Sequence, residues 1–352
     1  MALRVEKAHL VAALTQATKA VETRNTVPIL ANVLLSADAS KLTVRATDTD
    51  VEITTSVPAD GALDTTTAPA RTLLDIAKRM PNGAEISLAL DGGILTVSHG
   101  RSRFKVATLP VEDFPTMTQP AYPVGLAIDL AALLAPVAFA MSTEETRFYL
   151  NGVYLHSVHG RLRAVATDGH RLAAVYGPDL DLPEGIIIPR KTVGMIPSGE
   201  IEVDIGPGRI RFTAGDTVIV SKLVEGTFPD YERVIPKNND RPVTLDRALM
   251  SAAVERVGVF ASERGGKAVK LEVAPGGVTF TVNGEGGQAS DELAADYTGE
   301  PFDIGYNASY LTEMLRSVEG GKVTFEISDS SSPARIVGAN DNWCGVLMPM
   351  RV

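Results

Sequence analysis

The stretch that decides the fold is LTVRATD, residues 42–48, which returns as LRAVATD at residues 162–168. The first copy alternates apolar and polar residues, as a half-buried β-strand does, and the second has the same residue at four of the seven positions. The pairs Thr47-Asp48 and Thr167-Asp168, which end the two copies, lie 120 positions apart. A recurrence over so long a period indicates a duplicated domain rather than a chance likeness between unrelated domains.

The same order of elements surrounds each copy and occurs a third time along the chain. An amphipathic helical pattern opens each repeat, at residues 7–24, 129–147 and 246–264. Alternating strands follow, and in the third repeat they are residues 268–273 and 278–282. A shorter helix is then expected at 71–76, 190–193 and 308–314, and another strand meander comes after it. Each repeat is therefore predicted to be an α+β layer of two helices packed on an antiparallel sheet.

Proline-containing stretches mark the boundaries between the repeats. Residues 119–123 and 236–242 each hold two prolines, which fix the backbone and remove hydrogen-bond donors. The 352-residue chain accordingly divides into three predicted domains. These are residues 1–120, 121–240 and 241–352.

Composition suits a globular protein of a reducing compartment. The single cysteine, Cys344, excludes an intrachain disulfide. The longest apolar run, residues 130–141, is too short to span a bilayer, and the first residues lack the pattern of a signal peptide. We therefore expect a cytoplasmic protein that does not contact a membrane.

Charge is distributed unevenly between the predicted helices and the rest of the chain. The net formal charge is +4 over the six helical spans, counted as residues 7–24, 70–80, 129–147, 189–196, 246–264 and 308–318. The whole chain has a net charge of −10, which leaves −14 for strands and loops. This is the distribution expected of a body that contacts phosphates with its helices. The general preference of helices for Lys and Arg over Asp explains part of it equally well. Aromatic residues are sparse, at 5%, and no base-reading motif is evident, so any nucleic-acid contact should be sequence-independent.

Several longer motifs occur in order across all three repeats. The most specific is ATDGHRLA at residues 166–173. The others are Arg24 with VPIL (27–30), PAR (69–71), YLNG (149–152), FPDYERVIP (228–236) and MPMRV (348–352). Together they resemble the bacterial DNA polymerase III beta subunit family, the sliding clamps, and the resemblance covers the whole chain.

The resemblance implies a DNA clamp fold of three similar domains, two copies of which join head to tail into a six-domain homodimeric ring. Such a ring encircles duplex DNA, slides without reading sequence and serves as a processivity factor for the replicative polymerase. The family implies no catalytic residue, metal or cofactor. It implies as partners the DNA polymerase III alpha subunit, the clamp-loader delta subunit, and other polymerases and repair proteins, all through short clamp-binding peptides.

The resemblance also assigns residues to three surfaces. The peptide groove, between the second and third domains, would use Leu150, Thr167, Gly169, His170, Arg171, Leu172, Pro229, Arg233, Val234, Asn307, Tyr310, Val346, Leu347, Met348, Pro349, Met350 and Arg351. DNA contacts would come from Arg24, Arg71, Arg79, Arg190, Lys191 and Tyr310. The dimer interface would place Phe104 and Val106 against Val259 and Phe260. Leucine, valine and methionine suit a groove that must accept several peptides.

Three features depart from the family pattern. Glu144 stands where relatives carry a neutral DNA-facing residue, so the second domain should hold DNA less tightly. Pro136 falls inside the predicted helix 129–147 and should break or kink it. The loop 263–267 lacks an apolar residue and is left out of the predicted sites.

Two other classes of function compete with the clamp. Asp168, Gly169, His170 and Arg171, with Asp48 and Asp50 as metal ligands, could be read as the site of a monomeric hydrolase. A turn between paired strands, rich in Asp, Asn and Gly, explains the same residues without catalysis. A generic nonspecific DNA-binding protein is the third class. The segments 99–103 and 284–287 resemble phosphate-binding loops only weakly, and hairpin turns explain both.

Overall fold

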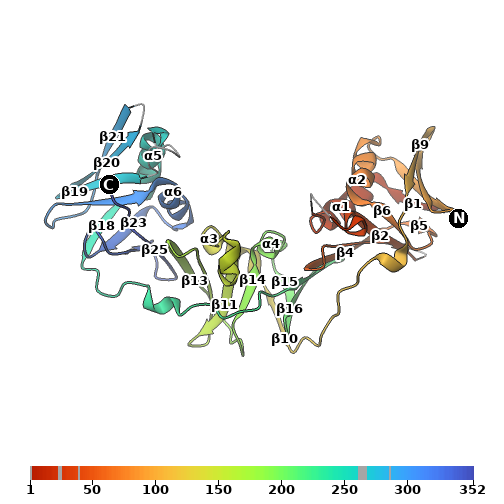
Figure 1. Cartoon of the computed structure of the whole chain (residues 1–352), viewed down its shortest axis with the longest axis horizontal. Helices are drawn as coiled ribbons and strands as arrows, with labels where there is room; N and C mark the ends of the chain where they lie inside the picture. Colours follow the sequence, from red (N-terminus) through yellow and green to blue (C-terminus); the bar gives the residue numbers. More distant parts are fainter. Residues whose placement is uncertain (1, 23–25, 39, 261–267, 285–286) are drawn as a thin grey trace. The chain divides into compact units, whose positions relative to one another are not determined.

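The computed structural model describes residues 2–22, 26–38, 40–260, 268–284 and 287–352 (Figure 1). The chain forms two compact units, one of residues 1–130 and 195–223 and the other of residues 131–194 and 224–352. The predicted central domain thus contributes residues to both units. Each unit is an α+β assembly of one eight-stranded and one smaller antiparallel sheet with helices packed on them.

The first unit contains the first repeat and half of the second. Its five-stranded sheet has the order β5 (Asp60–Gly61), β1 (Leu3–Glu6), β7 (Glu85–Asp91), β8 (Ile94–His99) and β9 (Ser102–Ala107). Its eight-stranded sheet runs β10 (Val124–Ile128), β15 (Ile201–Gly206), β16 (Arg209–Ala214), β17 (Thr217–Lys222), β4 (Val51–Pro58), β3 (Lys41–Thr47), β2 (Asn32–Ala37) and β6 (Thr66–Pro69). Helices α1 (Lys7–Ala17) and α2 (Ala70–Arg79) pack against each other, and the short helices η1 (Pro28–Ala31) and η2 (Val111–Asp113) lie in connections.

The second unit contains the other half of the second repeat and the third. Its eight-stranded sheet runs β14 (Ile186–Pro189), β11 (Gly152–Val158), β12 (Arg161–Thr167), β13 (Arg171–Asp179), β25 (Trp343–Leu347), β24 (Ala334–Val337), β23 (Lys322–Ile327) and β18 (Arg241–Asp246). The four-stranded sheet is β21 (Gly287–Ala294), β20 (Gly277–Gly284), β19 (Ala268–Ala274) and β22 (Phe302–Asn307). The α-helices of this part of the chain are α3 (Leu130–Ala138), α4 (Arg190–Val193), α5 (Arg247–Val257) and α6 (Ala308–Ser317). Single turns form η4 (Tyr231–Arg233) and η5 (Gly258–Phe260), and η3 (Glu145–Leu150) is a 3₁₀ segment kinked at Arg147.

Strand register confirms the predicted repeat. In the first copy Ala46 pairs with Ile53 across the β3–β4 hairpin, and in the second Ala166 pairs with Ala173 across β12–β13, each residue 120 positions further on. The β20–β21 hairpin of the third copy has the same form, with Val282 opposite Ala289. The three copies therefore share hairpin geometry as well as sequence order.

Neighbouring repeats are joined by antiparallel strand pairing. Strand β4 of the first repeat pairs with β17 of the second, where Ile53 lies opposite Ile219. Strand β13 of the second repeat pairs with β25 of the third in the same way, where Ala173 lies opposite Gly345. In the described sheets β21 and β9, the counterparts of these joining strands, are both edge strands. Unpaired backbone donors and acceptors on such an edge are available to another strand.

The predicted first helices are shorter in the structure than the sequence patterns indicated. Helix α1 ends at Ala17, because the chain tightens into successive i to i+3 turns through Val21, and residues 23–25 lie outside the described part. Helix α5 ends at Val257, and residues 261–264 of the predicted span likewise lie outside it. The predicted helix 129–147 was wrong as one element.

Pro136 accounts for part of this last difference. It lies inside α3, which ends two residues later at Ala138, and a separate turn of 3₁₀ helix begins at Glu145. Proline removes an intrahelical donor and crowds the preceding turn, so the helix stops close by. The carbonyl of Pro136 accepts a 3.1 Å hydrogen bond from the indole Nε1–H of Trp343 on β25. Among the described residues, no helix is both long and apolar enough to cross a membrane.

Candidate partner-binding groove

A groove of about 640 Å3 lies in the second unit, between the β12–β13 turn, the segment 229–239 and strand β25. Eleven predicted residues line it: Leu150, Thr167, Gly169, His170, Arg171, Leu172, Pro229, Arg233, Val234, Val346 and Met348. The sequence analysis missed nine others, which are Asp230, Tyr231, Pro236, Lys237, Asn238, Asn239, Ser328, Ser332 and Pro333. Asn239 joins two of these segments, because its amide donates to the carbonyls of Glu326 and Pro333.

The groove has an apolar floor and an exposed apolar rim. Leu150, Leu172 and Val346 form the floor, and each is buried in a single hydrophobic cluster. Val234 and Met348 on the rim are 54% and 42% exposed. Exposed apolar side chains beside a hollow are typical of a surface that another molecule covers.

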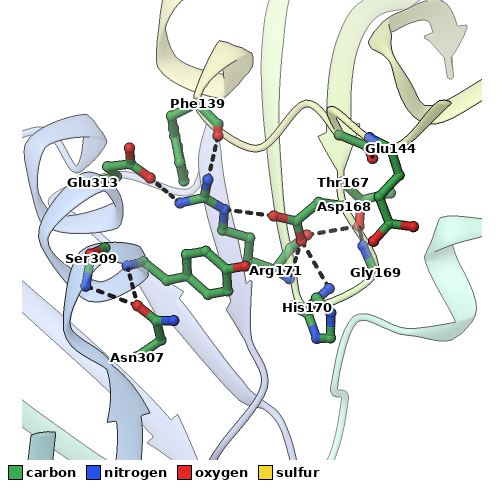
Figure 2. Close-up of polar contacts among 12 residues, drawn as sticks. Phe139, Glu144, Thr167, Asp168, Gly169, His170, Arg171, Asn307, Ser309 and Glu313 are labelled. Atoms are coloured by element: carbon green, nitrogen blue, oxygen red, sulfur yellow. Dashed lines mark hydrogen bonds and ion pairs between the residues drawn. The ribbon is translucent and has the colours of Figure 1, made fainter. Parts of the chain in front are cut away.

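The turn between β12 and β13 forms one wall of the groove. The carboxylate of Asp168 accepts the backbone N–H groups of His170 and Arg171 at 2.9 and 3.0 Å, as Figure 2 shows. The hydroxyl of Thr167 donates to the carbonyl of Arg171 at 2.7 Å. Gly169 has a φ of +89°, a conformation that favours glycine, and a Cβ there would lie 2.6 Å from Arg147 Nη1, so a larger residue would have to displace that side chain.

The first repeat contains the same turn, which argues against a catalytic role for its residues. Asp48 accepts the N–H groups of Asp50 and Val51 at 2.9 and 2.7 Å, and Thr47 donates to the carbonyl of Val51. Thr49, the counterpart of Gly169, keeps a φ of +79°. The carboxylates of Asp48 and Asp168 therefore build a turn, as the alternative explanation predicted, whereas Asp50 pairs with Lys222 and His170 stacks on Tyr310. The described residues contain no cluster of three potential metal ligands.

Arg171 is the most buried charged residue among those that line the groove, with 8% of its side chain exposed. Figure 2 shows its guanidinium between two carboxylates, those of Asp168 and Glu313. It also donates to the carbonyl of Phe139 at 2.7 Å and lies 4.3 Å from the centre of the Tyr310 ring. Arg171 thus ties the β12–β13 turn to helix α6 and to the end of α3.

The predicted residues of helix α6 lie next to this network rather than along the groove. Asn307 caps the helix by accepting the N–H groups of Ser309 and Tyr310 at 3.0 and 3.2 Å. The Tyr310 ring stacks on His170 with centroids 6.3 Å apart, and burial raises the pKa of its hydroxyl. A smaller cavity of about 350 Å3 lies here, lined by Tyr310 and Glu313 and sharing His170 and Arg171 with the groove.

The C-terminal residues of the predicted groove have different surroundings. Leu347 is fully buried in β25, and Met348 donates its N–H to the carbonyl of His170. Met350 is 39% exposed and bonds through its N–H to the carbonyl of Gly305 on β22 at 2.8 Å. Pro349 and Arg351 flank it, partly buried and exposed respectively.

The predicted DNA-contacting residues lie on short helices. Arg71 and Arg79 occupy the first and last turns of α2, and Arg190 and Lys191 begin α4. Arg79 pairs at 3.8 Å with Asp75, and Arg190 lines the smaller cavity. Arg24 lies outside the described residues. The six α-helices of the described chain carry nine Lys or Arg and three Asp or Glu residues, so the observed bounds keep the basic character predicted for them.

Glu144 does not stand alone on this surface. Its carboxylate forms a 2.6 Å ion pair with Arg147, and the hydrogen bond from Arg147 lowers the pKa of the carboxyl. Each charge therefore partly neutralises the other. Weaker DNA contact in the second repeat stays a prediction.

The predicted interface residues lie beside the two free sheet edges. Phe104 on β9 is 39% exposed, whereas Val106 is buried against its own sheet. Val259 and Phe260 in η5 are 81% and 36% exposed. Phe260 lies against the β20–β21 hairpin, where a Cβ added to Gly284 would approach its carbonyl oxygen to 2.4 Å.

Family models identify all three repeats. Models of the DNA polymerase III beta subunit match its N-terminal domain over residues 1–118, its central domain over 128–230 and its C-terminal domain over 232–351. The beta sliding clamp of Caulobacter vibrioides strain NA1000 is 42% identical and that of Escherichia coli K12 is 36% identical, each alignment covering 100% of both chains.

Solved structures of clamps have the same fold. A Caulobacter crescentus beta sliding clamp superposes with a TM-score of 0.95 at 41% identity and covers 100% of this chain and 99% of its own. A Bartonella birtlesii clamp bound to griselimycin gives a TM-score of 0.94 at 40% identity, with 100% of both chains covered.

Replacing Arg171 by Met should destabilise the second unit by roughly 2 kcal/mol, because Asp168 and Glu313 would lose the charge that offsets them. The fluorescence of Trp343, the only tryptophan, reports urea unfolding of this unit. Arg316→Met, which breaks an exposed pair with Glu255, is the control and should leave the midpoint almost unchanged. Equal midpoints for both variants would contradict the structural role of Arg171.

Proposed function

Because this chain belongs to the DNA polymerase III beta subunit family, the sliding clamps, we propose that two copies join through β9 and β21 and hold partner peptides in the groove described above. The chain is a non-catalytic processivity subunit of DNA polymerase III. The observation that carries the proposal is the repeated strand pairing between repeats, which leaves one matching edge free at each end of the series. A ring dimer is consistent with the clamp relatives.

The two strand pairings between repeats, β4–β17 and β13–β25, predict the register of the proposed β21–β9 pairing between subunits. Ile53 and Ala173 occupy one equivalent position, and their partners Ile219 and Gly345 occupy another. Within its hairpin, Ala289 takes the position of Ile53 and Ala173. Phe104 takes the position of Ile219 and Gly345, because these three residues pair with Val97, Phe212 and Ile336 respectively. By the same rule Ala289 of one protomer lies opposite Phe104 of the partner subunit.

Charge supports this pairing of unlike edges. Strand β9 carries Arg103 and Lys105, whereas β21 carries Asp291 and Glu292. In the proposed register Glu292 lies opposite Arg101 of the partner subunit. Pairing β9 with β9, or β21 with β21, would place like charges together, so electrostatics favours the head-to-tail arrangement.

A chain carrying both Ser290→Cys and Arg103→Cys should form a covalent dimer on mild oxidation, because these residues lie opposite each other across the proposed interface. Directly opposed Cβ atoms in antiparallel strands are about 4.5–5.5 Å apart, close enough for a disulfide after a small adjustment. The readout is the yield of covalent dimer on a non-reducing gel. Ser290→Cys with Ser102→Cys is the matched control, since one residue of slip turns the side chain to the other face. Preferential cross-linking of the control pair would overturn the register.

Residence on DNA follows from topology rather than affinity. A closed ring cannot leave a circle sideways, so phosphate contacts from Arg71, Arg79, Arg190 and Lys191, with Arg24 and Tyr310, can stay weak enough for sliding. We propose these as the DNA-facing residues. The basic composition of the helices and the exposure of Arg71, Arg79 and Arg190 support them.

The test of topology uses nicked circular DNA, onto which a bacterial clamp loader places the protein with ATP. The protein should resist a high-salt wash, which screens phosphate contacts, and should be released when the circle is linearised. The quantity measured is the protein that remains with the DNA after each step. Retention of the protein on linear DNA with open ends, or its loss from the intact circle in high salt, would contradict the proposal of a closed ring.

The groove is proposed to bind short peptides of the DNA polymerase III alpha subunit, the clamp-loader delta subunit, and other polymerases and repair proteins. Its apolar floor would take leucine and aromatic anchors, and Met348 can adapt its side chain to different peptides. We also propose a cytoplasmic location, which the free, buried Cys344 supports.

Deleting residues 348–352 should abolish binding of such peptides while leaving the dimer intact. The deletion removes the rim residue Met348 and the tail bonded to Gly305, but it leaves β25 and both free edges in place. Fluorescence anisotropy of a labelled peptide measures the first effect, and sedimentation velocity measures the second. Dissociation of the dimer would show that the tail belongs to the interface instead.

A further inference from the structure

A second wall of the groove is the segment 228–234, which carries two kinds of side chain. Pro229, Arg233 and Val234 face the groove, whereas Phe228 is buried in the cluster beneath it at 7% exposure. Tyr231, which is 5% exposed, belongs to that cluster and also reaches the groove lining. A wall without a strand or long helix of its own depends on these buried side chains for its position. What holds them therefore sets the shape of the groove.

Aromatic stacking provides the first attachment to the sheet. Phe228 stacks on Tyr154 of β11 with centroids 4.9 Å apart and an angle of 8°. The Tyr231 hydroxyl lies 2.9 Å from His156 Nε2, and His156 in turn stacks on Tyr154. Burial raises the pKa of Tyr231 well above its usual range, and burial together with Arg163 lowers the pKa of His156. Both groups are thus neutral near pH 7, and a hydrogen bond joins them, with the donor set by the tautomer of the imidazole.

Arg163 provides the second attachment, and it comes from below the wall. Only 7% of its side chain is exposed, and its guanidinium forms an ion pair with Glu232. The guanidinium carbon lies 5.2 Å from the centre of the Tyr231 ring and 4.6 Å from that of Tyr176 on β13. Arg163 therefore contacts two consecutive residues of the wall segment, yet it is not among the residues that line the groove.

We propose that Arg163 is a positioning residue for partner binding, which fixes the wall that carries Pro229, Arg233 and Val234 without touching the peptide. The proposal rests on the groove being the peptide site. Arginine suits this position because its planar group can stack on rings while its N–H groups bond a carboxylate, which the ammonium of lysine cannot do together.

Two other residues allow the role of Arg163 to be tested: Cys344 reports on opening of the buried cluster, and Arg211 serves as a control. Cys344, the single cysteine, lies in the same buried cluster, and burial raises the pKa of its thiol, so it should react slowly with thiol reagents. Arg211 on β16 makes a similar set of contacts in the first unit. It bonds Asp204 at 3.0 Å and lies 4.4 Å from the centre of the Tyr122 ring, and none of the three lines the groove.

The experiment compares Arg163→Met, Arg163→Lys, Glu232→Gln and Arg211→Met in the full-length dimer. The probe is a fluorescein-labelled nonapeptide ending in Leu-Phe, with griselimycin as competitor. We expect Arg163→Met to weaken peptide binding at least tenfold, mainly through faster dissociation. It should also speed labelling of Cys344 by opening the cluster to reagent, although loss of the arginine raises the pKa of the thiol further. Arg163→Lys and Glu232→Gln should have intermediate effects, and Arg211→Met should match the unchanged protein in both assays.

The outcomes separate a positioning role from general destabilisation. Unchanged peptide affinity in folded Arg163→Met, judged by Trp343 fluorescence, overturns the proposal. An equal loss in Arg211→Met overturns it as well, because the effect would then reflect stability alone. If Arg163→Met does not fold, Arg163→Lys and Glu232→Gln decide by the same criteria. Failure of the unchanged protein to bind the peptide would refute the groove itself, and this proposal with it.

Discussion

Antiparallel pairing between strands of different repeats is the interaction on which the rest of the structure depends. At β4–β17 and β13–β25 the hydrogen-bond ladder of one repeat continues into the next, so two sheets of eight strands replace what would be separate smaller sheets. The second of these ladders carries β25 alongside β13. It thereby brings Val346 next to Leu172 and builds the floor of the groove from residues that are distant in sequence.

The two well-defined turns differ in what surrounds them, because only the second lines the groove. Thr47-Asp48 and Thr167-Asp168 build the same hydrogen-bonded turn, even to the positive φ of Thr49 and Gly169. The difference lies in the flanking strands. Thr43 and Val51 of the first copy correspond to Arg163 and Arg171 of the second. Each of these buried arginines links its strand to a segment outside the sheet, Arg163 to Glu232 and Arg171 to Glu313, so the second hairpin supports its neighbours through two charged side chains.

Much of this was predictable from sequence, because it depends on local pattern. The strand hairpins and the turn at Asp168 follow from residues within a short distance of one another, and the repeat is visible because the same local pattern returns. Sequence motifs shared with the clamp family were enough to assign Leu150, Leu172 and Met348 to the groove. Helix ends were harder to predict, since the i to i+3 turns after Ala17 compete closely with continued helix.

The contribution of Arg163 could not have been found in the same way. Its partner Glu232 is 69 residues away, and no motif connects an arginine on one strand with a linker that far along the chain. The lining from Pro236 to Asn239 and from Ser328 to Pro333 escaped prediction for a related reason. These are loop residues without a recognisable pattern, and they meet only because Asn239 bonds across to the neighbouring loop.

The two free edges have a consequence for how mutations act on the assembled ring. A closed dimer of identical chains contains the β9–β21 contact twice, related by a two-fold axis. Any substitution on either strand is therefore present at both contacts. Its free-energy cost counts once when the ring opens at one contact and twice when the subunits separate. Dissociation of the dimer should respond to such a change as the square of the factor by which opening responds.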